Sequence, residues 1–90
     1  MTETDDPSIE VLGEVLRERA RQNAKWGEQN HHPMEWLSIL GEEVGEACEA
    51  ANEAHWHASG RQPWAGYRKE LVQVAAVAVA AIEALDRRPT

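Results

Sequence analysis

Apolar residues recur three and four positions apart in three segments of this 90-residue chain, the spacing of one face of an α-helix. Asp6 and Pro7 form a typical helix start, with Asp as N-cap and Pro in the first turn. Gly27 predicts the end of this helix, Pro33 opens the next, and Pro89 prevents continuation of the last. The predicted helices run from about residue 7 to 25, from 33 to between 55 and 59, and from between 63 and 67 to about 87.

The second helix carries an apolar stripe that should face the core, made of Leu37, Leu40, Val44, Ala47, Cys48 and Ala51. Cys48 is the only cysteine, so no intramolecular disulfide can form, and its position predicts a small buried residue. Gly41 and Gly45 lie four apart on one edge of this stripe. Because Gly weakens a helix interior, the pair suggests that another helix crosses closely, although a stable helix also tolerates single glycines.

The third helix is almost wholly apolar, since Gln73 is the only polar residue from Leu71 to Ile82. A helix that is apolar all round is covered all round, and two other short helices cannot do that alone. We therefore expect an all-α fold, with three helices per chain in a four-helix-type bundle completed by oligomerisation as a homodimer or homotetramer. Residues 1–90 form one domain, of which 1–6 are expected to be a flexible tail.

A formal net charge of −7 argues against nonspecific binding to nucleic acid or to an anionic membrane. The acidic start of the chain does not resemble a signal peptide. The apolar run Val74–Ile82 is far shorter than the ~20 residues of a membrane span. These features favour a soluble, cytoplasmic protein.

Acidic residues are concentrated on the second helix, where no Lys or Arg occurs between Met34 and Gly60. Four of them share a face opposite the apolar stripe and are typical of a solvated surface: Glu42, Glu46, Glu49 and Glu53. Glu43 instead flanks the stripe, three residues before Glu46. Glu70 and Gln73 are likewise three apart at the start of the buried third helix. Carboxylates gathered there would suit a hard cation such as Mg²⁺, whereas a purely solvated acidic face remains the alternative.

Other metal sites fit the sequence less well. The four histidines lack the spacing of structural zinc ligands, and no cysteine lies near enough to join them: His31, His32, His55 and His57. A di-iron bundle requires Glu-x-x-His on each of two helices. In this chain the spacing occurs once, at Glu28 and His31, between the first two predicted helices.

The order Glu43-Val-Gly-Glu46, a spacer of 23 residues and Glu70-Leu-Val-Gln73 resembles the signature of the all-α nucleoside triphosphate pyrophosphohydrolases, the MazG-like family. Two further stretches, 21–29 around Lys25-Trp26-Gly27 and 67–78, also resemble MazG-like proteins. The resemblance covers about residues 18–88. The family pattern ends in Glu-x-x-Asp, and this chain has Gln73 where the Asp is usual.

The resemblance implies cleavage of a nucleoside triphosphate, ribo or deoxyribo, to the monophosphate and pyrophosphate, in removal of unwanted nucleotides. It implies Mg²⁺, or Mn²⁺, on Glu43, Glu46, Glu70 and Gln73, with Glu43 or Glu46 also accepting the proton of the attacking water. The amide of Gln73 brings no charge, so a second metal ion should bind weakly. Candidate substrate contacts are Lys25 to phosphate, Trp26 to the base, and Asn30; otherwise Trp26 closes the core and Lys25 is solvated. The rival hypothesis is a non-catalytic oligomerisation or regulatory module descended from such an enzyme.

Overall fold

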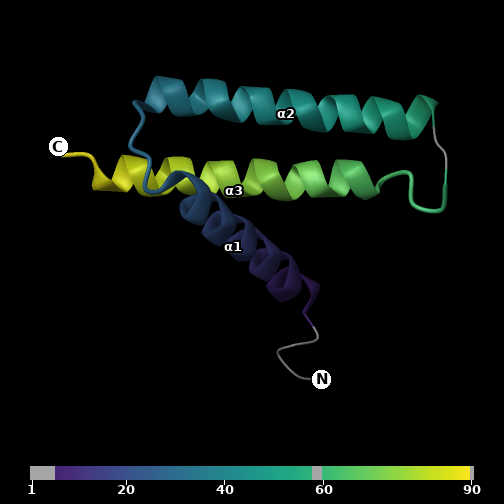
Figure 1. Ribbon diagram of the computed structural model, residues 1–90, viewed down its shortest axis with the longest axis horizontal. Coiled ribbons are helices and arrows are strands. Elements are labelled where there is room, and N and C mark those ends of the chain that lie inside the picture. Colours follow the sequence, from purple (N-terminus) through teal and green to yellow (C-terminus); the bar gives the residue numbers. More distant parts are fainter. Residues whose placement is uncertain (1–5, 58–59, 90) are drawn as a thin grey trace.

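The computed structural model describes residues 6–57 and 60–89, and these residues form three α-helices without any strand. The helices are α1 (Pro7–Trp26), α2 (Pro33–Trp56) and α3 (Ala65–Arg87) (Figure 1). The all-α prediction and the helix bounds are confirmed. The predicted tail lies mostly in residues 1–5, outside the described residues.

Local signals account for where the helices begin and end. The Asp6 carboxylate accepts a hydrogen bond from the Ser8 backbone N–H at 2.9 Å, so the predicted N-cap of α1 is confirmed. Gly27 follows α1 with φ 73°, in the left-handed region that glycine adopts at little cost. The start of α2 has a capping box that the sequence analysis missed. The His32 Nδ1 accepts from the Met34 N–H at 3.1 Å, and Glu35 accepts from the His32 N–H at 3.0 Å.

The core lies between α2 and α3, which run side by side in opposite directions (Figure 1). On α2 the inward positions are 36, 40, 43, 47, 50 and 54, an alternation of four and three residues typical of helix seams. Trp36 packs there against three buried residues of α3: Val77, Ala80 and Ala84. Alanines occupy most other core positions, so the two helices can approach each other closely.

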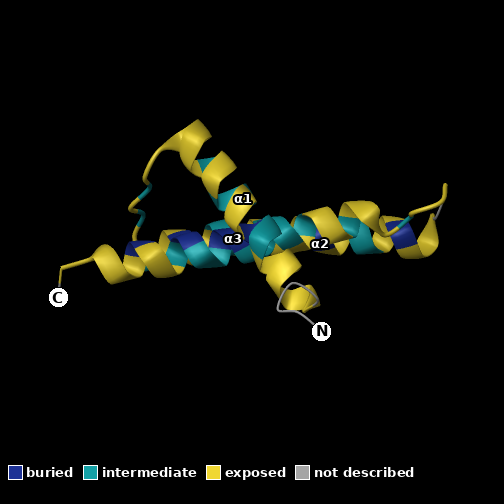
Figure 2. Ribbon diagram, turned by 90° about the horizontal axis from the view of Figure 1, so that it is seen from below, coloured by how far each residue is buried: buried dark blue, intermediate teal, exposed yellow. Residues whose placement is uncertain are grey.

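Helix α1 crosses α3 obliquely, and Val15 is its only buried residue (Figures 1 and 2). Two ion pairs hold the crossing. Arg19 bonds Glu83, and Arg68 bonds both carboxylate oxygens of Glu14 at 2.7 Å. Because α1 approaches α3 at an angle, it leaves space beside the α2–α3 seam, and the candidate site lies there.

Part of the predicted core stripe of α2 is wrong for the single chain. Leu37 is 61% exposed, Val44 is 44% exposed, and Cys48 is exposed rather than buried. A Cβ added at Gly41 or Gly45 would meet nothing within 4 Å among the described residues, so no helix of this chain crosses closely there. The physical reason is that α2 packs against α3 with a neighbouring row of residues, which begins at Trp36.

The acidic face of α2 agrees with its prediction, since Glu42, Glu46, Glu49 and Glu53 are all exposed. Helix α3 is only partly covered, with Ile82 59% exposed and Leu85 55% exposed. Within residues 6–57 and 60–89, no helix combines the length and apolar character needed to cross a membrane.

Candidate metal centre and its adjoining cavity

Glu43 occupies a core position although it is charged. It lies one heptad after Trp36 on the α2 seam, and it is half-buried. Glu70 and Gln73 are also half-buried. They lie on the same face of α3 as the buried residues Val77 and Ala80, but nearer to the start of the helix. The α2–α3 interface is therefore apolar at the end near Trp36 and becomes polar where these side chains meet.

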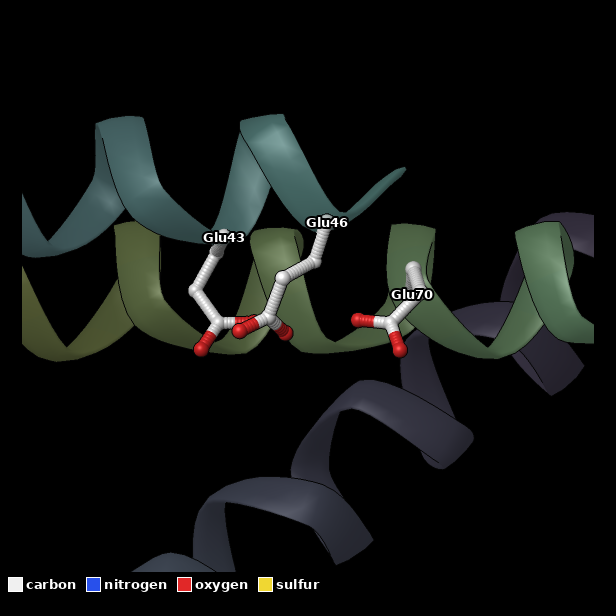
Figure 3. A group of neighbouring side chains, drawn as sticks. All are labelled: Glu43, Glu46 and Glu70. Atoms are coloured by element: carbon white, nitrogen blue, oxygen red, sulfur yellow. The ribbon is translucent and has the colours of Figure 1, made fainter. Parts of the chain in front are cut away.

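Glu43, Glu46 and Glu70 come together at this polar point. Each contributes one carboxylate oxygen to a group in which all three atoms lie within 4.8 Å of one another. The side chains of Glu43 and Glu46 come from α2 and that of Glu70 from α3, and the carboxylates gather on the side of the pair that α1 approaches (Figure 3). Three of the four predicted ligands are thus neighbours in space, although a spacer of 23 residues separates Glu46 from Glu70 in the sequence.

In the part of the chain that the structure describes, no Lys or Arg forms an ion pair with these three carboxylates. Oε2 of Glu43 and Oε2 of Glu70 are both buried and have no hydrogen-bond partner in the described part of the chain. Loss of water raises the pKa of Glu43 above its usual value, and the negative charges of Glu46, Glu70, Glu18 and Glu42 raise it further. An unpartnered buried carboxylate oxygen is costly unless a positive group satisfies it.

The donor set fits a divalent cation. Adjacent oxygen ligands of one Mg²⁺ ion lie about 3 Å apart, given Mg–O bonds of about 2.1 Å. Oxygens within 4.8 Å of one another are close enough for small rotations of the side-chain torsions to bring them to that spacing. A cation held between Glu43 and Glu70 would supply the positive partner that their buried oxygens lack among the described residues. Because three carboxylates must then be deprotonated, binding should weaken as the pH falls.

Gln73 lies in a cavity beside the cluster rather than in a dry core. The cavity has a volume of about 260 Å³, and it is lined by residues of all three helices that include Glu43 and Gln73. The Gln73 amide makes no hydrogen bond to another group within the described ranges.

The predicted substrate residues are placed differently from one another. Trp26 is 62% exposed and lines the cavity with Glu43, so it does not close the core. The Lys25 ammonium lies 4.8 Å from the centre of the Trp26 ring, a cation–π contact. Asn30 lines a different cavity and accepts a hydrogen bond from Arg87 at 2.9 Å. Of the three, Trp26 is the one that the fold brings to the cavity of Glu43.

Several residues of this site were missed by the sequence analysis. Trp36 lines the cavity, and its indole N–H is buried without a partner in the described part of the chain. Gln22 and Gln29 line it as well, and Glu18 of α1 is close enough to act on the pKa of Glu43. The spacing of seven residues between Trp36 and Glu43 was visible in the sequence. The contribution of α1 was not, because it depends on the angle at which α1 crosses α3.

Two of the histidines pack against tryptophan rings. His31 packs edge-on against Trp36 with 5.0 Å between ring centroids, and His55 packs likewise on Trp56 at 4.4 Å. Among the described residues, the Glu43–Glu46–Glu70 group is the one cluster of potential ligands close enough to share an ion.

Comparison of the chain with protein-family models, with curated proteins and with solved structures gave no match.

Proposed function

We propose that this protein is a Mg²⁺-dependent nucleoside triphosphate pyrophosphohydrolase. The observation that carries the proposal is the convergence of Glu43, Glu46 and Glu70 within 4.8 Å, with two orphaned buried oxygens. The resemblance of these residues and their spacing to the MazG-like signature supports the reaction class. A cavity beside the carboxylates offers room for part of a nucleotide.

The reaction consumes one water and one nucleoside triphosphate. The water oxygen bonds to the α-phosphorus, and the bond from that phosphorus to the α–β bridging oxygen breaks. The bridging oxygen keeps the electron pair and leaves with pyrophosphate. The proton released by water passes to the carboxylate of Glu43 or Glu46 and then to solvent.

Three carboxylates and one amide would hold the cation: Glu43, Glu46, Glu70 and Gln73. When bound, the cation supplies charge neutralisation for the triphosphate and activation of water. Burial of the Glu43 and Glu70 oxygens favours tight contact with a positive group, because water does not compensate their charge. The neutral amide of Gln73 leaves the site with three charges, which favours one ion over two.

Trp26 is the best candidate for contact with the base. Its ring is 62% exposed and lines the cavity that also contains Glu43. An aromatic face stacks on any nucleobase, so this contact would add affinity with little selectivity. Lys25 lies over the same ring and would compete with the base for one of its faces.

We further propose that a second copy of the chain covers the outer face of α2 and α3. That face has an apolar groove, lined by Pro33, Trp36, Leu37, Leu40, Ala81, Ile82 and Leu85. Leu37 and Ile82 are 61% and 59% exposed, which is costly for large apolar side chains that line one continuous groove. A homodimer, or a tetramer built from dimers, would bury them.

The decisive experiment is an assay of purified protein with a panel of ribo- and deoxyribonucleoside triphosphates and Mg²⁺ in water labelled with ¹⁸O. We expect equimolar monophosphate and pyrophosphate, with the label in the monophosphate because water attacks the α-phosphorus. Glu46→Gln should abolish turnover. Glu53→Gln, at an exposed acidic position on the same helix, is the matched control and should retain it.

Two results would count against the proposal. Label in inorganic phosphate would indicate attack at the γ-phosphorus and a different class of phosphatase. No turnover across the panel, together with no effect of Mg²⁺ on the melting temperature, would favour the non-catalytic module that Gln73 in place of Asp allows.

A further inference from the structure

A second cleft opens between α1 and the start of α3, next to the carboxylate cluster. Its volume is about 610 Å³. The residues that line it are Glu14, Arg17, Glu18, Arg21, Gln62, Ala65, Arg68, Lys69, Val72 and Gln73. Four of the nine Lys and Arg residues of the chain are in this set, although the chain as a whole has a net charge of −7.

Two of the four cations are held in place by carboxylates. Glu14 accepts two hydrogen bonds from Arg68, both at 2.7 Å, and Glu18 accepts two from Arg21, at 2.9 and 2.6 Å. Each pairing leaves further N–H donors of the guanidinium free, because Arg carries five. The pairs lower the pKa of Glu14 and of Glu18, so these carboxylates stay charged and keep the guanidinium groups oriented.

The other two cations, Arg17 and Lys69, act on the carboxylates only at longer range, where they help to lower the pKa of Glu14 and of Glu18 respectively. Arg17 and Lys69 form no ion pair within 4.0 Å in residues 6–57 and 60–89. Four cations facing one cleft with two carboxylates between them leave an excess of positive charge there. An oxyanion in the cleft would remove the repulsion between them.

The cleft adjoins the cavity that contains Glu43. Glu18, Arg21 and Gln73 line both the cleft and the cavity that contains Glu43. Lys69 directly precedes Glu70 on α3. A polyphosphate with one phosphate at the carboxylate cluster can therefore extend its remaining phosphates into the positively charged cleft or into solvent.

We infer that the cleft formed by Arg17, Arg21, Arg68 and Lys69 binds the di- or triphosphate chain of a small polyanion. Resting on the proposed function, this assigns the β- and γ-phosphates of the substrate, and the pyrophosphate product, to these four side chains. Arg21 and Arg68 present fixed planar donors, whereas Arg17 and Lys69 add charge. Binding through these cations explains how a strongly acidic protein takes up a polyanion.

The test uses inorganic tripolyphosphate as the probe, titrated calorimetrically into protein freed of metal with a chelator. The cleft variant combines Arg17→Gln with Lys69→Gln. The matched control combines Arg61→Gln with Arg88→Gln, two exposed positions outside the cleft that change the net charge equally. Circular dichroism and melting temperature verify that both variants are folded.

A contact between unit charges at 4 Å in water changes affinity by a factor of about 5. We therefore expect the cleft variant to bind tripolyphosphate about tenfold more weakly or worse, and the control less than about twofold. Equal losses in both variants would overturn the inference, because they would reflect net charge alone. Absence of binding to the wild-type protein would overturn it as well.

The kinetics separate this inference from the proposed function. If turnover occurs, the cleft variant should raise KM and weaken product inhibition by pyrophosphate more than it lowers kcat. Turnover with an unchanged KM would refute the cleft while the function stands. Specific tripolyphosphate binding without any turnover would leave the cleft in place and refute the function.

Discussion

Removing the charge of Glu43 should stabilise the fold and abolish metal binding together. Glu43 occupies a seam position, its pKa is raised by burial and by neighbouring carboxylates, and its Oε2 has no partner in the described part of the chain. Glu43→Gln keeps the shape of the side chain and deletes its charge. We therefore expect the variant to melt at a higher temperature than the wild-type protein when no divalent cation is present.

The magnitude follows from the separation of the charges. Two unit charges at 4.8 Å repel by about 0.9 kcal/mol in water and about 3.5 kcal/mol at an effective dielectric of ~20. The lower figure applies to the exposed Glu46 and sets a minimum for the half-buried Glu70, so relief from both gives about 2 kcal/mol. For a domain of this size that amounts to a rise in Tm of about 8–16 °C.

The effect should depend on pH in one direction. A carboxyl whose pKa is raised in the folded state costs stability as the pH rises from its ordinary value, 4.5, through the raised value. The difference in Tm between variant and wild type should therefore be full at pH 8 and disappear below about pH 4.

The assay is thermal unfolding followed by circular dichroism, at fixed protein concentration, with and without Mg²⁺. At ten times its Kd, the ion should stabilise the wild-type protein by about 1.4 kcal/mol and Glu43→Gln far less. Glu53→Gln is the control, and its stability should remain within about 0.5 kcal/mol of the wild type. A lower Tm for metal-free Glu43→Gln would refute the reasoning, since it would mean that the carboxylate makes a stabilising contact.

Three further predictions concern the packing and the assembly. Ala76 has no exposed surface, so Ala76→Leu should cost about 1–3 kcal/mol in chemical denaturation, whereas Ala24→Leu on the exposed surface of α1 should be nearly neutral. The hydrogen bond from Arg68 lowers the pKa of Glu14, so the ion pair stabilises the fold above the ordinary carboxyl pKa and this stabilisation is lost as the pH falls. The melting temperatures of Glu14→Gln and wild type should therefore converge in acid. A difference in melting temperature that persists in acid would contradict this role of the ion pair. Leu37→Glu should reduce the molar mass measured by light scattering to that of one chain, and an unchanged mass would exclude the groove as the interface.

Helix positions were predictable because the signals that start and end helices are local. An Asp-Pro pair, a glycine with positive φ and a Pro at the start of α2 act through groups only a few residues away. The pairs Glu43/Glu46 and Glu70/Gln73 were visible for the same reason, since residues three apart share a helix surface.

The choice of buried face was decided only by the tertiary structure. Helix α2 has two neighbouring seams with apolar residues, one headed by Trp36 and the other by Leu37. Periodicity fits both seams, because each repeats every three or four residues. Packing against α3 selects the seam of Trp36, since its alanines allow the helices to approach closely and its partner residues on α3 are small.

That selection also formed the candidate site. Because α2 packs with the Trp36 seam toward α3, Glu43 faces inward and lies near Glu70. The oblique crossing of α1 places Glu18 and the basic side chains of the cleft beside them. By itself the sequence determined which residues are helical and which carboxylates share a helix surface, because both depend on neighbours in the chain. Which carboxylates meet across helices, and which cations lie beside them, depends on contacts between residues distant in the sequence, and only the packing of the three helices decided it.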